Sequence, residues 1–160
     1  MSTRSRIASY DSVEGTFTSI YCHHDGYPEH NGRILFYHYQ DDDKIQKLLD
    51  LGKLSVLGRR LAPDPPEEHS FENPAQEVCL AYARDRDNDP SAGIAFEEAS
   101  LGSLMAHTSE TGCEYLYLWM GGEWGVYFVH DPNWDLKPIF NENQWAKLET
   151  VLNHIGGGPI

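Results

Sequence analysis

The chain has 160 residues, of which 40% are hydrophobic, and carries a formal net charge of −13 with a pI near 4.8. This length is typical of a single domain that buries about two thirds of its unfolded surface. The acidic composition argues against direct binding to nucleic acid, because phosphate binding requires clustered Lys and Arg. It favours a basic protein partner, or a surface that imitates the charge of a nucleic acid.

The cysteines and the apolar patterning indicate a cellular compartment. Cys22, Cys79 and Cys113 lie far apart in the sequence and form no CxxC pair. The N-terminus lacks the apolar segment of a secretory signal, and no apolar run approaches the length that spans a membrane. We therefore expect a reduced, cytoplasmic protein that does not contact a membrane.

The first forty residues predict a flexible start, a strand and a helix. Residues 1–13 are polar, basic and aperiodic, which predicts a flexible N-terminus ahead of a single α+β domain over residues 14–156. Residues 15–22 are rich in β-branched and aromatic types and predict a strand. A helix is expected over residues 31–39, with Asn31 as its N-cap.

A second helix follows directly. Asp41 and the next two acids supply an N-cap and a favourable first turn, and Gly52 is placed to end the helix. Its buried stripe is expected to be Ile45, Leu48 and Leu49. Residues 55–58 then predict a turn, and the proline-rich residues 62–76 predict a long surface loop.

The middle of the chain gives weaker patterns. Residues 78–83 predict a strand, and residues 84–90 a charged loop. Residues 94–96 are consistent with a short strand. A helix is expected over 97–108, although Gly102 disfavours it. Its inward residues are expected to be Leu101, Leu104 and Met105.

Two strands flanking Gly121 and Gly122 predict a β-hairpin over residues 114–129, because Gly-Gly suits a two-residue turn. The register places three pairs on one face: Trp119 with Trp124, Tyr117 with Val126, and Tyr115 with Phe128. The opposite face is expected to carry Leu116, Leu118 and Tyr127.

A last helix is expected to begin at Asn141 or Asn143 and to end at the glycines that start with Gly156. Its apolar stripe would be Trp145, Leu148, Leu152 and Ile155. The order of elements predicts an α+β fold: a small antiparallel or mixed sheet with a C-terminal aromatic hairpin, packed by about four helices.

Residues 21–32 contain a thiol, three imidazoles, a carboxylate and two glycines, the densest set of reactive groups in the chain. Asp25 and Gly26 are typical of a turn, so we expect the Asp25 carboxylate to accept backbone N–H groups there. His23 is expected to point into the fold. Tyr27 and Pro28 are expected to pack over the first helix.

These residues also carry a resemblance. The run SIYCHHDGYPEHNGRIL, followed by LLDLGKLSVLG, resembles a group of small uncharacterised phage and prophage proteins with the signature Tyr-Cys-His-x-Asp-Gly-Tyr-Pro. The later AYARDRD and EYLYLW…GEWGVYFV are similar too, so the resemblance covers residues 15–152. It implies a phage or prophage origin and leaves the mechanism open.

Two chemical hypotheses concern this stretch. Cys22, His24 and His30 are weak candidates for metal ligands, although the paired spacing of known zinc signatures is missing. Cys22 beside His23 suggests a thiol nucleophile, but neighbours on a strand point to opposite faces. A base would then come from elsewhere. The candidates for that base are His38, His107 and His130. The alternative is a hydrogen-bonded turn with Cys22 as a small buried side chain.

Two further hypotheses concern charge. Arg84 and Arg86, on either side of Asp85, could clamp a carboxylate or phosphate, or could pair locally with neighbouring acids. Those acids are Asp85, Asp87 and Asp89. The acidic surface could imitate nucleic acid or simply be solvated. The residues concerned are Asp41, Asp42, Asp43, Asp64, Glu67, Glu68, Glu97 and Glu98.

We therefore expect a phage-type accessory protein that binds another protein in the host cytoplasm, without catalysis, metal or cofactor. The alternative is a small metal- or thiol-dependent hydrolase centred on Cys22, His23 and Asp25. No glycine-rich phosphate loop, nucleophile elbow or HExxH motif is present, and no catalytic residue or oligomeric state is assigned. The candidate binding residues are Cys22, His23, Asp25, Tyr27, Arg84, Asp85 and Arg86.

Overall fold

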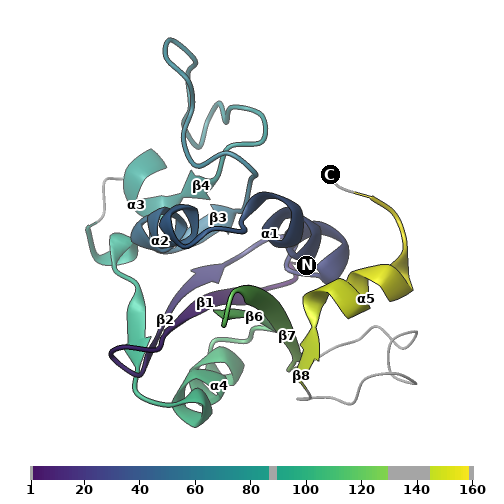
Figure 1. Cartoon of the computed structure of the whole chain (residues 1–160). Coiled ribbons are helices and arrows are strands. Elements are labelled where there is room, and N and C mark those ends of the chain that lie inside the picture. The colour runs from purple at the N-terminus through teal and green to yellow at the C-terminus, as the bar shows by residue number, and fades with distance from the viewer. Residues whose placement is uncertain (1, 87–89, 130–144, 159–160) are drawn as a thin grey trace.

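A computed structural model describes residues 2–86, 90–129 and 145–158 (Figure 1). These residues form one mixed sheet of eight strands in the order β4-β3-β2-β1-β6-β7-β8, with β5 paired to β2 beside that path. The strands are β1 (Ser5–Asp11), β2 (Thr16–Cys22), β3 (Leu54–Val56), β4 (Leu80–Ala81), β5 (Phe96–Glu98), β6 (Tyr115–Met120), β7 (Glu123–Phe128) and β8 (Trp145–Lys147). The helices are α1 (Arg33–His38), α2 (Asp42–Asp50), α3 (Tyr82–Asp85), α4 (Leu101–Glu110) and α5 (Leu148–Ile155). The predicted α+β class is confirmed.

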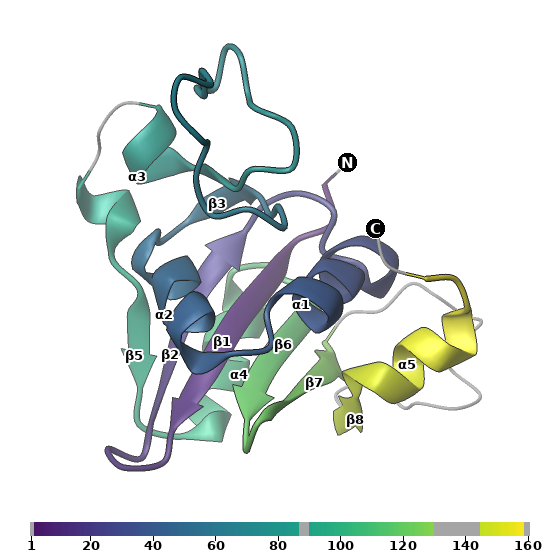
Figure 2. The same cartoon turned by 45° about the horizontal axis from the view of Figure 1, so that its top comes forward.

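The helices cover both faces of the sheet. Helices α1, α2 and α5 lie over one face and α4 lies over the other (Figure 2). The larger core fills the first interface, and the smaller core, which includes Leu104, Leu116 and Leu118, fills the second. No helix in the described ranges is long and apolar enough to cross a membrane.

The prediction of a flexible N-terminus is wrong for residues 5–11. These residues form β1, which pairs antiparallel with β2 and parallel with β6 and so lies inside the sheet. The first four residues of β1 are buried. Because both faces of this strand are covered, its sequence shows no alternation between polar and apolar residues.

The aromatic hairpin is confirmed with its register. Strands β6 and β7 pair Trp119 with Trp124 around Gly121 and Gly122, whose φ angles are +64° and +80°. All six residues predicted to share one face belong to the larger core. Both indoles also bond to the helical side: Trp119 Nε1 donates to Asp42 Oδ1 at 2.7 Å, and Trp124 Nε1 donates to a carbonyl oxygen, that of Tyr39, at 2.7 Å.

Helix α2 also matches its prediction. The Asp41 carboxylate accepts the Lys44 N–H at 3.0 Å and caps the helix, and Gly52 follows the C-terminus with a φ of +74°. Its buried residues are Ile45, Leu48 and Leu49. Asn31, in contrast, is not the N-cap of α1. It lies in a π-helical turn, Pro28–Gly32, and Gly32 precedes the first residue of α1.

Several boundaries differ from their predictions. Ser55 belongs to β3, so residues 55–58 are not only a turn. The strand expected over 78–83 is reduced to β4, because the chain turns into α3 at Tyr82. The helix expected from residue 97 begins at Leu101, where the Ser100 hydroxyl accepts the Ser103 N–H at 3.1 Å.

The C-terminal helix is shorter than predicted. Trp145 lies in β8, paired with Tyr127, and α5 begins only at Leu148. Leu148 and Leu152 are buried, and Gly156 ends the helix with a φ of +86°. Four residues named above lie outside the described residues: Asp87, Asp89, Asn141 and Asn143. The candidate base His130 lies outside them too.

Candidate functional site

The histidine-rich turn, residues 21–32, first extends the pairing of β2 with β3 and then leaves the sheet. After β2, the N–H groups of His23 and His24 donate to two carbonyl oxygens of β3, each at 3.0 Å. Asp25 then adopts a φ of +56°, and the Gly26 N–H donates to the Thr3 carbonyl at 2.9 Å. A Cβ atom at Gly26 would lie only 2.7 Å from the Ser5 Cβ. Glycine is therefore required where the turn packs against β1.

Asn31, rather than Asp25, is the centre of this turn. Its side chain is fully buried, and Nδ2 lies 3.3 Å from Ser5 Oγ and 3.4 Å from both Cys22 Sγ and the His24 carbonyl. In the described part of the chain, no backbone N–H donates to the Asp25 carboxylate. That carboxylate accepts the Tyr27 hydroxyl at 3.1 Å. The predicted role of Asp25 is corrected accordingly.

Cys22 is chemically protected. The thiol is fully buried, and burial raises the pKa of Cys22 to about 12. Its Sγ lies 3.7 Å from the His24 carbonyl oxygen, while His23 uses Nδ1 to bond the Tyr21 hydroxyl at 2.9 Å. The thiol and imidazole therefore do not form a nucleophile–base pair, and a neutral thiol is a poor nucleophile at neutral pH.

The imidazoles of the turn make separate contacts. His24 Nδ1 lies 3.0 Å from Ser2 Oγ, and His30 Nδ1 lies 2.8 Å from Asn31 Oδ1. His23 is half-buried beside His24 and does not point into the core as predicted; burial lowers the pKa of His23. Among the described residues, no three His, Cys, Asp or Glu side chains are grouped so that they could hold a metal ion.

Tyr27 behaves more nearly as predicted. It packs against the larger core, to which Ile34 and Leu35 of α1 belong. The Tyr117 hydroxyl donates to the Gly26 carbonyl at 2.6 Å and joins the turn to β6. The turn is therefore fastened to β1, β3 and β6 by groups that satisfy one another.

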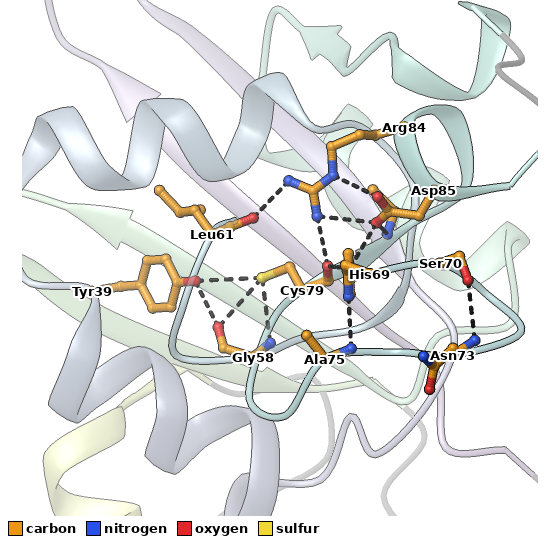
Figure 3. Close-up of polar contacts among 11 residues, drawn as sticks. Tyr39, Gly58, Leu61, His69, Ser70, Asn73, Ala75, Cys79, Arg84 and Asp85 are labelled. Carbon is orange, nitrogen blue, oxygen red and sulfur yellow. Dashed lines mark hydrogen bonds and ion pairs between the residues drawn. The ribbon is translucent and has the colours of Figure 1, made fainter. Parts of the chain in front are cut away.

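Arg84 and Asp85 form a second polar cluster (Figure 3). Arg84 Nε donates to Asp85 Oδ1 at 2.7 Å, and Nη2 donates to Oδ2 at 3.0 Å. The remaining guanidinium contacts are to two carbonyls, of Leu61 at 2.7 Å and Cys79 at 2.8 Å. Every nitrogen of this guanidinium thus has an acceptor within the protein, which agrees with local pairing and not with a clamp for a ligand.

His69 completes this cluster and was not found from the sequence. Its Nδ1 accepts the Ala75 N–H at 2.9 Å, so the proton lies on Nε2, within 3.0 Å of the Cys79 carbonyl and 3.2 Å of Asp85 Oδ2 (Figure 3). The side chains of His69 and Asp85 are 2% and 4% exposed. Both ring nitrogens are occupied, so the pair fastens the long loop to β4 and α3.

Asp85 is stabilised in its charged form. Burial alone would raise the pKa of Asp85, but hydrogen bonds from Arg84 and from the Ala81 N–H outweigh it, and the pKa is lowered. Arg86 makes a different contact. Its guanidinium carbon lies 4.7 Å from the ring centroid of Tyr82 and 5.6 Å from that of Phe71.

A hollow of about 510 Å³ lies on the sheet face that carries α4. No local sequence pattern indicated this hollow, because its lining residues are spread from β1 to the end of α4. Three basic residues, Arg6, Lys53 and His107, line it together with Ile94 and Phe96. Arg6 lies within the segment that had been expected to be flexible.

No family model, curated protein or solved structure matches this chain. The resemblance to phage and prophage proteins therefore stays a prediction.

Proposed function

We propose that this protein is a non-catalytic accessory protein of the phage type, which binds another protein through the hollow beside α4. One observation carries the proposal. Ile94 and Phe96, on the rim of this hollow, are 68% and 54% exposed although both are large apolar side chains. Exposed apolar residues grouped at one hollow are typical of an interaction site, whereas scattered ones are not.

The candidate catalytic groups support a non-catalytic protein. Cys22 is buried with a raised pKa, and His69 has both ring nitrogens bonded. A hydrolase would need an accessible nucleophile next to a base with a free nitrogen. The phage-type origin and the host cytoplasm as the location rest on the sequence resemblance and belong to the same proposal.

The acidic surface supports imitation of nucleic acid less well. Of the eight acids considered, six already make contacts within the protein: Asp41, Asp42, Asp64, Glu67, Glu68 and Glu98. The net charge of −13 still favours a partner with a basic surface and disfavours direct contact with nucleic acid.

The proposal is tested by affinity capture from a bacterial host lysate. The bait proteins are the wild type, an Ile94→Lys/Phe96→Lys double variant, and Val13→Lys as the control. Val13 is the most exposed large apolar residue described, at 89%, and does not line the hollow. We expect the wild type and the control to retain the same protein and the double variant to lose it.

Two results would contradict the proposal. The first is retention of the same protein by the double variant. The second is esterase or peptidase activity of the wild type that disappears in a Cys22→Ala variant, which would instead support the hydrolase alternative.

A further inference from the structure

We propose that the hollow contains a carboxylate-binding site whose anchor is Arg6. The carboxylate would be that of an acidic side chain or a C-terminus of a protein partner. This deepens the proposed function and rests on it for the nature of the partner, but the site itself is argued from the Arg6 side chain.

The Arg6 guanidinium is buried and incompletely bonded. The residue is 0% exposed on the central strand β1, and Nε donates to Ser19 Oγ at 2.8 Å. Within the described ranges, Nη1 and Nη2 have no hydrogen-bond partner. A buried charge normally has a partner for each donor, because desolvation without compensation is costly. An acceptor from a bound ligand would complete the set, since the described residues supply none to these two nitrogens.

The unpartnered atoms point to a specific chemistry. With Nε held by Ser19, the two free donors are the terminal nitrogens of the guanidinium, a planar fork that matches the two oxygens of a carboxylate. Lys53 lines the same hollow and adds a second positive charge. Because the chain carries a net charge of −13, this grouping of cations is a local exception.

The nearby acidic groups do not neutralise Arg6 fully. Glu98 lies close enough to interact with Arg6, but its oxygens bond Ser103 Oγ at 2.6 Å and His107 Nδ1 at 3.1 Å. The Cys113 thiol also interacts with Arg6, but a thiol is only a weak acceptor. Burial raises the pKa of Cys113, so the thiol stays neutral at neutral pH and gives the guanidinium no negative partner.

The rim favours a carboxylate over a phosphate. Ile94 and Phe96 supply an apolar surround for the group that carries the anion, whereas a phosphate dianion would require more donors than one guanidinium fork. The Phe96 ring centroid lies 5.4 Å from the Arg6 guanidinium carbon and covers it. Entry of a carboxylate therefore requires the half-exposed Phe96 side chain to turn away.

The first experiment titrates the purified ¹⁵N-labelled protein with acetate, acetamide and inorganic phosphate at constant ionic strength, and follows the Arg6 Nε–H signal. We expect a saturable shift with acetate, none with the neutral acetamide, and a weaker response to phosphate. Phe96→Ala should bind acetate several-fold more tightly, because the covering ring is removed. Arg6→Met should abolish the shifts of neighbouring amides. Arg59→Gln is the control, because Arg59 is exposed and paired with Glu77.

A second arm distinguishes the two sources of a carboxylate. Two short apolar peptides are compared, one with a free C-terminus and no acidic residue, the other amidated at its C-terminus with an internal Glu. Tighter binding of the first assigns the site to a C-terminus, and tighter binding of the second assigns it to an acidic side chain.

Several results would overturn the inference. These are no saturable acetate shift in either the wild type or Phe96→Ala, an equal response to acetamide, or tighter binding of phosphate than of acetate. If Arg6→Met fails to fold, the comparison of acetate with acetamide and of wild type with Phe96→Ala still tests the carboxylate site. The titration needs no protein partner, so the two proposals can fail separately. If acetate binds but the Ile94/Phe96 double variant still captures the same protein, only the proposed function is rejected. If acetate does not bind but the double variant loses the captured protein, only the carboxylate site is rejected.

Discussion

Arg84 and Arg6 carry the same guanidinium group in opposite surroundings. The Arg84 side chain is 32% exposed, yet each of its nitrogens donates to a carboxylate or carbonyl oxygen of the protein. Arg6 is fully buried, yet only Nε has an acceptor among the described residues. Desolvation alone would require the reverse, since the more deeply buried charge needs the more complete set of partners. The difference separates an arginine that holds the fold together from one that is available to a ligand.

The Arg84 cluster shows what a purely structural polar group looks like. It joins the loop that follows Gly58 to the β4–α3 junction through Leu61, His69 and Cys79 (Figure 3). Its members hydrogen-bond to one another, so removal of any member leaves buried partners unsatisfied. Substitutions of Arg84 and Asp85 should therefore destabilise the protein, whereas substitution of the incompletely bonded Arg6 should not.

The largest effect is expected for Arg84→Met. The substitution keeps much of the apolar stem but leaves the buried Asp85 carboxylate without its bidentate partner. It also leaves the Leu61 carbonyl without this donor and the Cys79 carbonyl with His69 alone. We expect the free energy of unfolding to fall by about 3 kcal/mol, measured by urea denaturation. A loss below about 0.5 kcal/mol would show that the cluster does not hold the loop.

A smaller and pH-dependent loss is expected for Asp85→Asn. The folded-state pKa of Asp85 lies below the ordinary value of 3.8, so ionised Asp85 stabilises the folded state above about pH 4. This contribution is lost as the pH falls through the lower folded-state pKa. The difference in melting temperature between wild type and variant should therefore be largest near neutral pH and shrink in acid. A constant difference from pH 7 to pH 3 would contradict the pairing.

The histidine-rich turn is expected to depend on Asn31 more than on Asp25. Asn31→Ala removes a fully buried amide that bonds Ser5 of β1, Cys22 of β2 and the His24 carbonyl. The loss should lower the free energy of unfolding by about 2 kcal/mol. Asp25→Asn should cost less than about 0.5 kcal/mol, because asparagine also tolerates a positive φ and can accept the Tyr27 hydroxyl. Equal losses in parallel thermal melts would restore the central role first predicted for Asp25.

The contrast between these residues also shows how far the sequence could predict the structure. The hairpin was predictable because alternation and Gly121-Gly122 are local signals that fix both turn and register. Strand β1 was missed because Ser5 and Arg6 resemble the start of a polar tail, and only their pairing with β2 and β6 explains their burial. Trp145 was assigned to a helix for the same reason, since its pairing with Tyr127 in β7 is not a local property.

The candidate site was less predictable than the fold. The cysteine and histidines at residues 22–24 stand out in the sequence, but their reactivity is decided by burial and by Asn31, which lies further along the chain. The pair formed by His69 and Asp85 is separated by 16 residues and has no motif. The hollow around Arg6 combines residues from β1 to α4, so no window of the sequence could contain it.

Arg6→Met is expected to cause no large loss of stability, and it is the sharpest test of the comparison with Arg84. The substitution removes one bond to Ser19 but also removes a buried charge whose terminal nitrogens lack partners in the described residues. Replacing such a charge by an apolar side chain of similar length is commonly neutral or stabilising. In a buffer free of carboxylates we therefore expect the free energy of unfolding to stay within about 1 kcal/mol of the wild type, or to rise. Ser19→Ala is the control for the lost bond.

Added acetate should then raise the melting temperature of the wild type but not that of Arg6→Met, because a ligand stabilises only the folded state that binds it. A loss of more than about 2 kcal/mol in Arg6→Met would mean that Arg6, like Arg84, is a structural arginine.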